Sequence, residues 1–325
     1  MKVAVIGGTR HVGPDIVCLL VEAGHRVQVY NRGLTESKLP DGVEHITVDR
    51  RVQGQLGNAL KNHRPEVVID MICYSVNEIV EVLAALPSLH HYIFCSSTVV
   101  YGRIGDNTPN ELSPVDMNDV YGRNKAECDM YLVEQYHQDG IPFTSLRLSH
   151  PYGPRDHLLY TTGRESLFLD RMRKQRPIII PGNGATRIHP IYVKDAARAF
   201  IHVLNRAESY GKIYNLAGDE ILTLDDYFRS ISRVLGVPLI ASKYDRDYFR
   251  ENAPLWAEWK RRFDFGYNWV DYQNAVDVSL LKQTGFQCHT DHDAGILHTL
   301  HWLDGNALID LSGDDDEEDR ILNEM

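Results

Sequence analysis

The chain has few cysteines, and none of them stands at the spacing of a metal-binding or redox pair. Its 325 residues hold five cysteines, at positions 18, 73, 95, 128 and 288, with no Cys-x-x-Cys motif. An odd number cannot all pair with one another, so we interpret the thiols as reduced and predict a cytoplasmic protein. Long apolar runs are also lacking, since none reaches the roughly 18 residues of a membrane span. The first apolar run begins at residue 2; we therefore expect neither a signal peptide nor a membrane partner.

An excess of positive charge is missing as well. The sequence has 34 lysines and arginines against 45 acids, a formal net charge of −11. Because proteins bind nucleic acids largely by neutralising phosphates with basic side chains, this balance disfavours a nucleic-acid partner. Much of the acidity lies in residues 304–325, where nine acids accompany one arginine. Such a block is usually solvated, so we predict an acidic C-terminal tail, with a docking role for this tail as the alternative.

Residues 1–150 alternate short apolar runs with helical patterns. Strands that are apolar along their length and separated by helices indicate a parallel sheet covered on both faces. Such sheets bind ligands at the carboxyl ends of the strands, where the strand order reverses. We therefore predict an α/β fold with a Rossmann-like doubly wound parallel sheet that binds a dinucleotide. The expected strands are KVAVIG, RVQVY, HITVD, EVVIDMI, HYIFCSS and FTSLRLS, with helices at residues 14–23 and 75–86.

After residue 150 the pattern becomes irregular. Glycine-rich turns such as PGNGATR alternate with short helical stretches, and no internal repeat is visible. We predict a smaller C-terminal lobe, mainly residues 151–303, which closes over the sheet and binds the substrate.

A glycine-rich turn follows the first strand, although the middle glycine of the Gly-x-Gly-x-x-Gly spacing is absent. Glycine lets the backbone approach a pyrophosphate, and the next helix offers free N–H groups at its N-terminus. Pro14 suits a first helical turn. A phosphate loop of nucleotide hydrolases would need Lys and then Ser or Thr where the chain has Pro14 and Asp15. The predicted cofactor-binding residues of the turn are Gly7, Gly8, Thr9, Arg10, His11, Val12 and Gly13.

The second strand lacks the terminal acid that would bond an adenosine ribose. It ends at Asn31 and Arg32. An acid there would repel a 2′-phosphate, whereas Arg32 and Arg10 could bind one with bidentate geometry. This favours NADP over NAD as the cofactor, with NAD as the alternative. Asp49 and Met71, near the ends of the next two strands, complete the predicted cofactor-binding set, with Asp49 at the adenine amino group.

Three side chains with catalytic potential converge on the sheet edge. Ser97 ends the fifth strand, 24 residues before Tyr121. Tyr121 and Lys125 are four residues apart at the start of an expected helix, so they share one face. A Tyr-x-x-x-Lys pair is a weak signal by itself in a chain with 17 tyrosines. Together with the strand-end serine and the glycine turn, it predicts a catalytic site.

These motifs, in this order, resemble the extended or atypical short-chain dehydrogenases/reductases, of the NAD-dependent epimerase/dehydratase family. The resemblance covers about residues 2–303 and implies that segments within about 189–220 return to the sheet domain. The GGTR variant with NRG is similar to an atypical branch that includes chloroplast stem-loop RNA-binding relatives. The matching segments are GGTRHVG, CSSTVVYG, YGRNK, RLSHPYGPR, GNGATRIHPIYVKDAARAF, YNLAGDE and DVSLLKQTGF.

The resemblance implies an NAD(P)-dependent oxidoreductase or epimerase with Ser97, Tyr121 and Lys125 as catalytic residues. Tyr121 would act as general base on a hydroxyl or as general acid toward a ketone. Lys125 would lower the pKa of the phenol and hold the nicotinamide ribose, while Ser97 would bond the reacting oxygen. The family's dehydratases and decarboxylases carry an acid in the triplet that here reads Ser97-Thr98-Val99. An epimerase or a net reductase is therefore expected.

The resemblance also suggests substrate-binding residues. Arg187, in GNGATR, matches an arginine that binds the diphosphate of a nucleotide sugar. The family's second arginine has no aligned counterpart, and Arg261 or Arg262 is the candidate. Thr98 and His150 match positions beside the substrate. A less polar ligand is the alternative to a nucleotide sugar, because the segment after residue 250 is rich in aromatic residues.

No metal site is predicted. The segment CHTDHD, residues 288–293, has the residue types of metal ligands. It also precedes the expected last helix, where Asp291 suits an N-cap.

A homodimer is the expected assembly. The resemblance places its interface on the helix at residues 75–86 and the helix that carries Tyr121, and the first of these has apolar residues on more than one face. The alternative function is a dinucleotide-bound RNA-binding or regulatory protein, which a basic surface would distinguish.

Overall fold

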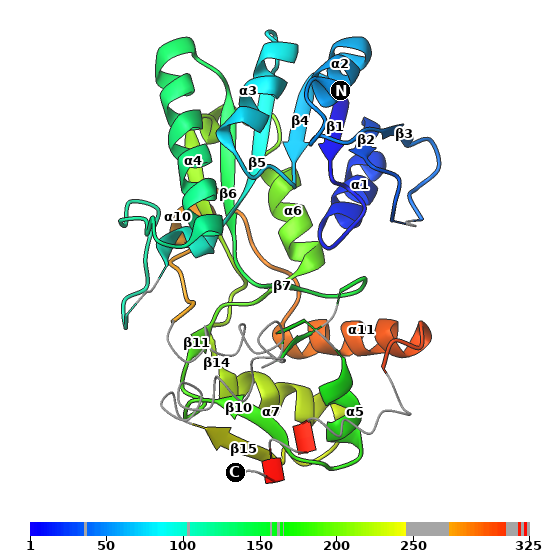
Figure 1. The fold of residues 1–325 in the computed structure, drawn as a ribbon, viewed down its shortest axis with the longest axis vertical. Helices are drawn as coiled ribbons and strands as arrows, with labels where there is room; N and C mark the ends of the chain where they lie inside the picture. The colour runs from blue at the N-terminus through cyan, green and yellow to red at the C-terminus, as the bar shows by residue number, and fades with distance from the viewer. Residues whose placement is uncertain are drawn as a thin grey trace.

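A seven-stranded parallel sheet forms the centre of the computed structural model (Figure 1). The structure describes residues 1–35, 38–102, 105–156, 158–160, 163–164, 166–244, 273–309, 318–319 and 322–323. The strand order is β13-β6-β5-β4-β1-β2-β3, so it reverses between β1 and β4. This arrangement confirms the predicted Rossmann-like doubly wound sheet. The strands are β1 (Lys2–Ile6), β2 (Arg26–Asn31), β3 (Glu44–Thr47), β4 (Val67–Asp70), β5 (His91–Ser97), β6 (Phe143–Leu148) and β13 (Lys212–Leu216).

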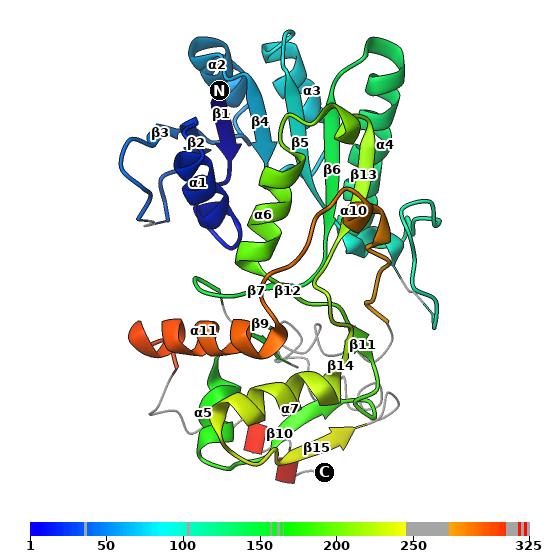
Figure 2. The same cartoon turned by 180° about the vertical axis from the view of Figure 1, so that it is seen from behind.

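Helices cover both faces of the sheet. One face carries α2 (Gln55–His63), α3 (Val76–Ala85) and α4 (Val120–Asp139), which lie in front in Figure 1. The other carries α1 (Gly13–Glu22) and α6 (Val193–Val203), which are in front in Figure 2. The two helices expected at 14–23 and 75–86 are present with ends shifted by one residue, whereas no sequence pattern had indicated α2.

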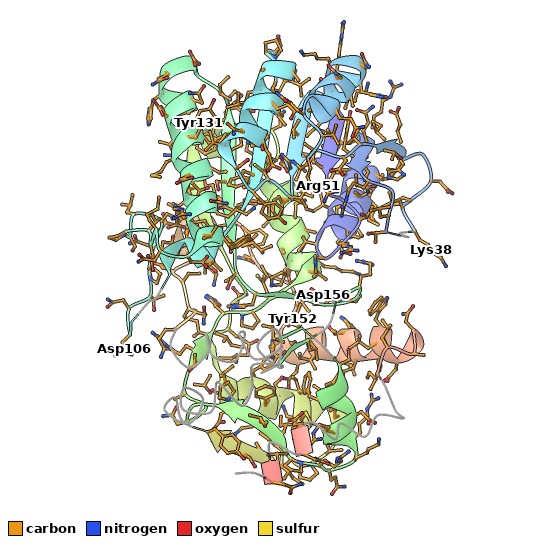
Figure 3. The ribbon with its side chains drawn as sticks, viewed as in Figure 1. Lys38, Arg51, Asp106, Tyr131, Tyr152 and Asp156 are labelled. Atoms are coloured by element: carbon orange, nitrogen blue, oxygen red, sulfur yellow. The ribbon has the colours of Figure 1, made fainter. Side chains whose placement is uncertain are left out.

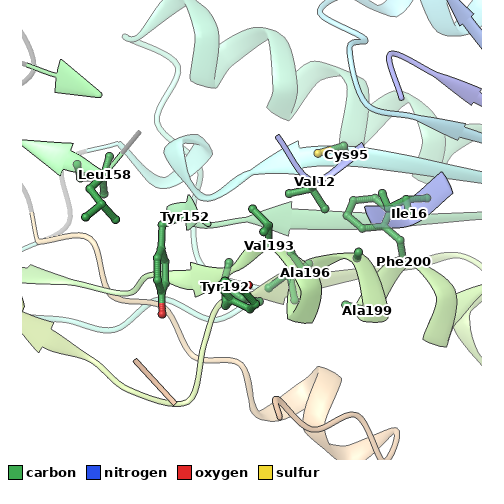
Figure 4. Close-up of a cluster of buried hydrophobic side chains, with 14 of the residues drawn as sticks. Val12, Ile16, Cys95, Tyr152, Leu158, Tyr192, Val193, Ala196, Ala199 and Phe200 are labelled. Atoms are coloured by element: carbon green, nitrogen blue, oxygen red, sulfur yellow. The ribbon is translucent and has the colours of Figure 1, made fainter. Parts of the chain in front are cut away.

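A buried apolar cluster joins α1 to α6 beneath the sheet (Figure 4). Ile16 of α1 and Phe200 of α6 are fully buried, and Val12, just before α1, is 1% exposed. Each such side chain contributes about 1.5–3 kcal/mol through its removal from water. This packing fixes the N-terminus of α1 at the carboxyl end of β1, which is where a dinucleotide site requires it.

A smaller lobe lies below the carboxyl ends of the strands in Figures 1 and 2. Both α6 and β13 return from it to the sheet domain, as expected for residues 189–220. The short helix α10 (Ser279–Gln283) also returns and packs beside β13, so a second segment within 151–303 leaves the lobe. The lobe contains α5 (Leu167–Arg173), β10 (Ile178–Pro181), β11 (Arg187–Ile188), β14 (Leu222–Thr223), α7 (Leu224–Leu235), β15 (Ala241–Tyr244) and α11 (His292–Gly305).

The described part of the acidic tail packs against the lobe. Helix α11 extends to Gly305, so the tail begins two residues later than predicted. Glu318 is 4% exposed, and Arg171 of α5 lies 3.4 Å from its carboxylate and 2.8 Å from that of Asp319. At these positions the expected solvated tail is wrong, because the buried Arg171 guanidinium needs anionic partners.

Each helix in the described ranges is too short or too polar to cross a bilayer.

Candidate active site

The glycines of the turn between β1 and α1 stand where the backbone leaves no room for a side chain. Gly7 has a φ of +88°, a conformation that glycine adopts without strain. A Cβ atom on Gly13 would lie 2.8 Å from the Cα of Gly8. Pro14 occupies the first turn of α1, as predicted. The backbone therefore turns tightly enough for the first N–H groups of α1 to face the strand ends, where they can bind an anion.

A cavity of about 760 Å³ opens beside this turn. Its volume lies within the roughly 300–1,000 Å³ of ordinary ligand sites. Gly8, Gly13, Lys125 and Arg187 are absent from its lining, and the two glycines act through the tightness of the turn. The predicted residues that the cavity brings together are Gly7, Thr9, Arg10, His11, Val12, Asn31, Arg32, Asp49, Met71, Ser97, Thr98, Tyr121 and His150.

Hydrogen bonds hold the Asn31 amide at the end of β2. Its Nδ2 donates to the Thr9 hydroxyl over 3.2 Å, and its Oδ1 accepts from the Gly33 amide over 2.7 Å. His45 Nε2 lies 2.7 Å from the same oxygen. A neutral amide thus takes the place at which a ribose-binding acid would exclude a 2′-phosphate.

Arginines surround this end of the cavity. Arg10, Arg32 and Arg51 are all exposed and line it, and the Arg10 Nε donates to the Thr35 hydroxyl over 3.0 Å. Arg51 forms a forked pair with Asp49, and these hydrogen bonds lower the pKa of the carboxyl to about 2. Among the described residues at this end of the cavity, three guanidinium groups against one carboxylate leave a local excess of positive charge. Sequence reasoning missed Arg51, although its place directly after a strand-end segment was a usable signal.

Arg50, also missed, points into the protein instead. Its Nη1 lies 2.8 Å from Asp70 at the end of β4, and its Nε lies 3.1 Å from Glu78 in α3. Glu78 in turn accepts a hydrogen bond of 2.6 Å from the backbone of Tyr74. Arg50 therefore ties the loop before α2 to the floor of the cavity between β4 and α3. Nothing in the sequence distinguished this buried arginine from its exposed neighbour.

Ser97 and Tyr121 meet on the other side of the β1–β4 reversal from Asn31. Both side chains line the cavity. Partial burial raises the pKa of Tyr121 to about 12, although the Ser97 hydroxyl acts in the opposite direction. The phenol is accordingly neutral near pH 7 in this structure. The sequence predicts both hydroxyls at one site, and the structure places both residues in the lining of one cavity.

The position of α4 explains this meeting. Asp119 caps the helix by accepting from the Gly122 amide over 2.6 Å. A Cβ atom on Gly122 would lie 2.7 Å from the carbonyl oxygen of Val99, so only glycine allows the first turn to approach the end of β5 so closely. Further along, the buried Asp129 carboxylate accepts from Arg147 of β6 over 2.8 Å and anchors α4 to the sheet.

Lys125 lies one helical turn from Tyr121, as predicted, but its ammonium is engaged elsewhere. It is 1% exposed and donates to the carbonyl oxygens of Cys73 (2.8 Å) and Cys95 (2.7 Å). The structure does not place it at the lining of the cavity, and the expected lowering of the phenol pKa is not present in this arrangement. The physical reason is that two backbone carbonyl groups, one in the loop after β4 and one within β5, satisfy the charge.

Tyr74 is a second phenol in the cavity that the sequence reading did not find. It is 46% exposed, and its ring centre lies 6.2 Å from that of Tyr121. The Lys125 ammonium lies 4.9 Å from the centre of the Tyr74 ring and 4.8 Å from that of Phe94, which is cation–π distance. The only available signal was an aromatic residue shortly after a predicted strand.

The predicted substrate residues divide into two groups. Thr98 and His150 line the cavity. Arg187 does not, because its guanidinium donates to the carbonyl oxygen of Asp106 over 2.7 Å, on the loop labelled in Figure 3. Its backbone N–H also donates to Gln273 over 2.8 Å. Arg261 and Arg262 lie outside the described residues.

The segment with metal-like residue types begins a helix. Asp291 accepts from the Ala294 amide over 2.8 Å and caps α11, which confirms the predicted N-cap. Within the described ranges, no three His, Cys, Asp or Glu side chains cluster in a way that could hold a metal ion.

The doubly wound sheet, the glycine turn and the cavity beside it form the architecture typical of dinucleotide-binding α/β proteins. The model of the NAD dependent epimerase/dehydratase family matches residues 72–217. This match includes the segment from the end of β4 to β13 and thus all three predicted catalytic residues.

Individual proteins of known name are also similar to this chain. The chain is 29% identical over 250 residues to the chloroplast stem-loop binding protein of 41 kDa b from Arabidopsis thaliana, covering 73% of this chain and 64% of that protein. It is 22% identical to 2'-dehydrokanamycin reductase from Streptomyces kanamyceticus, covering 82% and 77%. A crystal structure of Thermus thermophilus UDP-glucose 4-epimerase in complex with NAD has the same fold, with a TM-score of 0.75 at 21% identity, covering 94% and 99%.

These findings confirm the predicted resemblance to the NAD-dependent epimerase/dehydratase family. The match spans less than two thirds of the length of the chloroplast relative.

Proposed function

We propose that the chain is an NAD(P)-dependent epimerase or reductase that moves a hydride to or from a hydroxyl-bearing carbon of a small molecule. The observation that carries this proposal is that Ser97 and Tyr121 line one cavity together with the glycine turn. A nicotinamide dinucleotide in that cavity would supply or accept the hydride. The protein would then have to move one proton and hold the reacting oxygen.

Tyr121 is the proposed proton carrier. With a pKa of about 12 its phenol holds the proton at neutral pH, which suits donation to a ketone oxygen during reduction. In the reverse direction the phenolate would accept a hydroxyl proton, and a positive charge bound nearby would lower its pKa. Ser97, which lines the same cavity, would donate a hydrogen bond to the same substrate oxygen. Lys125 acts indirectly in this scheme, by holding the loop after β4 and strand β5 together.

Elimination chemistry is not part of the proposal. The position after Thr98 that bears an acid in the family's dehydratases is Val99, which is 42% exposed and lines the cavity. A valine side chain can neither donate nor accept a proton. The proposed reaction is therefore simple hydride transfer, with or without return of the hydride to the same carbon.

NADP is the proposed cofactor, with NAD as the alternative. The glycine turn has the tight approach that a pyrophosphate needs, so the residues present fit a dinucleotide. Arg10, Arg32 and Arg51 would bind a 2′-phosphate, and the neutral Asn31 would not repel it. The comparison structure of the Thermus thermophilus enzyme contains NAD, which supports the dinucleotide site but not this preference.

A nucleotide sugar is the proposed substrate class. The support is the shared fold with UDP-glucose 4-epimerase and the cavity residues Thr98 and His150. In this structure Arg187 is bonded to the Asp106 loop, so a diphosphate would have to displace that contact.

The direct test is native mass spectrometry of the purified full chain, followed by titration with NADPH and NADH. We expect a carried dinucleotide or tight binding of NADPH, and interconversion of UDP-glucose and UDP-galactose or reduction of a keto sugar. A chain that binds neither dinucleotide would contradict the proposal.

A second candidate is a dinucleotide-bound RNA-binding protein. The chloroplast stem-loop binding relative is the observation that favours it. The net charge of −11 opposes it, because phosphate neutralisation needs basic side chains. A gel-shift assay with stem-loop RNA at physiological salt separates the two, since tight and salt-sensitive binding would support the second candidate.

We also propose a homodimer and a cytoplasmic location. Helices α3 and α4 pack side by side on one face, where Val80 and Met130 are 41% and 51% exposed. Apolar side chains on adjacent helices support an interface there. All five cysteines are unpaired, which supports a reducing compartment. Light scattering coupled to gel filtration tests the dimer, and Met130→Glu should dissociate it.

A further inference from the structure

The segment Gly153–Asp156 reaches the glycine turn from the side of the lobe. Asp156 lies at the junction between the sheet domain and the lobe (Figure 3). Its Oδ2 is 2.7 Å from Nδ1 of His11, in the turn itself. The neighbouring Arg155 pairs with Asp15, in the first turn of α1. The adjacent residues Arg155 and Asp156 thus contact both sides of the turn. The two acids of these pairs, Asp15 and Asp156, are each only 6% exposed.

Both pairs include a residue with strained backbone. His11 has a φ of +50° and Arg155 a φ of +71°, in the left-handed region that non-glycine residues rarely adopt. Such conformations persist only where the surrounding structure holds them, and they cluster at ligand sites. Here the two strained residues lie on different segments, and the side chain of each contacts an acid on the other segment.

The charges of the two pairs have a clear consequence for an anionic ligand. Asp15 sits at the positive end of α1, where its own carboxylate would oppose a bound pyrophosphate. Arg155 neutralises that carboxylate. His11 lines the cavity and remains 54% exposed, and its contact with Asp156 fixes Nδ1 and leaves Nε2 for a ligand.

We propose that Gly153–Asp156 completes the pyrophosphate site, with Asp156 orienting the His11 imidazole toward the pyrophosphate and Arg155 cancelling the charge of Asp15. The inference rests on the proposed function only in requiring a bound dinucleotide. Asp156 and Arg155 are positioning residues, because they act through His11 and Asp15. An imidazole that donates both to Asp156 and to a phosphate oxygen carries a proton on each nitrogen.

The first test is a set of NADPH titrations of the full chain. We expect His11→Gln and Asp156→Ala each to weaken binding about tenfold, the range of a charge-assisted hydrogen bond. The double variant should bind no more weakly than the weaker single variant, since both remove one interaction. Effects that multiply, or unchanged affinities, would overturn the orienting role of Asp156.

The second test uses charge rescue. Arg155→Ala should weaken NADPH binding about tenfold, because Asp15 is left uncompensated, and adding Asp15→Asn should restore it to within about twofold. A merely structural role for Arg155 predicts no rescue, and that result would overturn the charge argument. Arg233→Ala is the matched control, because it removes an exposed arginine–aspartate pair with Asp293 in the lobe and should leave binding unchanged.

A spectroscopic measurement reads the imidazole directly. In long-range ¹H–¹⁵N spectra of the NADPH complex, with the signal assigned through His11→Gln, we expect both ring nitrogens of His11 to be protonated. Asp156→Ala should lose this pattern, and its retention would overturn the proposal. If the unaltered chain binds NADPH but these variants behave otherwise, only this inference fails; if it binds no dinucleotide, the proposed function fails with it.

Discussion

The Lys125 ammonium lies 5.8 Å from the centre of the Tyr121 ring, and its hydrogen bonds go to the carbonyl oxygens of Cys73 and Cys95. Backbone carbonyls thus satisfy the lysine, whereas the phenol lines the same cavity as Ser97. In the proposed mechanism Tyr121 transfers the proton and Lys125 supports the cavity floor. Substitution of Tyr121 and substitution of Lys125 should therefore have different effects.

Replacing Tyr121 by phenylalanine should remove most turnover and leave the site intact. Proton transfer by a positioned side chain contributes about 10²–10⁴-fold, so kcat should fall by that factor. The affinity for NADPH should stay within about threefold, because the ring remains in place. Steady-state kinetics with dinucleotide titrations measure both, and near-normal turnover would contradict the assignment of Tyr121 as general acid/base.

Replacing Lys125 by methionine should affect folding as well as turnover. The buried carbonyl groups of Cys73 and Cys95 would lose their donor, which costs about 1–3 kcal/mol for each unsatisfied group. Urea unfolding of Lys125→Met and Tyr121→Phe provides the comparison, and only the lysine variant should lose more than about 1 kcal/mol. Equal stability of the two variants would show that the carbonyl contacts are unimportant.

The preference between cofactors should depend on Arg32. Arg32→Gln should weaken NADPH binding about tenfold by removing one charged contact with the 2′-phosphate, while NADH binding stays within about twofold. Arg26→Gln, at the exposed start of the same strand, is the matched control. An equal loss for both dinucleotides would mean that Arg32 contacts a part they share, and it would remove the argument for NADP.

The fold was predictable because its signals are local. Apolar runs with intervening helices specify the sheet, and Tyr121 and Lys125 share a helix face through their spacing alone. The sequence could not predict in which direction long side chains point after folding. Lys125 and Arg187 both have nearby backbone carbonyls as partners, and Arg50 differs from Arg51 only in burial. These outcomes depend on tertiary contacts between segments far apart in the sequence.

Buried histidines should make stability depend on pH. His91 accepts from the Asn205 amide over 3.2 Å through Nδ1 and lies 2.9 Å from Thr144, and burial lowers its pKa to about 3. The unfolded chain binds this proton near its ordinary pKa of about 6.5. Stability is therefore fully present above about pH 6.5 and declines as the pH falls toward 3, because the unfolded state binds more protons.

His91→Asn should reduce this slope by up to about 1.4 kcal/mol per pH unit between pH 6 and 4. His90→Asn is the matched control, because His90 is the next residue and its side chain is 58% exposed. Guanidinium unfolding at several pH values measures both variants. An unchanged slope in His91→Asn would show that His91 titrates alike in the folded and unfolded chains.

The acidic tail should stabilise the lobe through Arg171. This arginine is 1% exposed and pairs with Glu318 and Asp319, so the double variant Glu318→Ala/Asp319→Ala leaves a buried cation without these partners. Loss of a buried ion-pair partner costs about 3–5 kcal/mol. By contrast, Asp304→Asn removes an exposed partner of Arg173 and should cost less than about 1 kcal/mol. Thermal unfolding at constant pH compares the two, and a tail variant as stable as the unaltered chain would show that residues 318–319 do not hold the lobe.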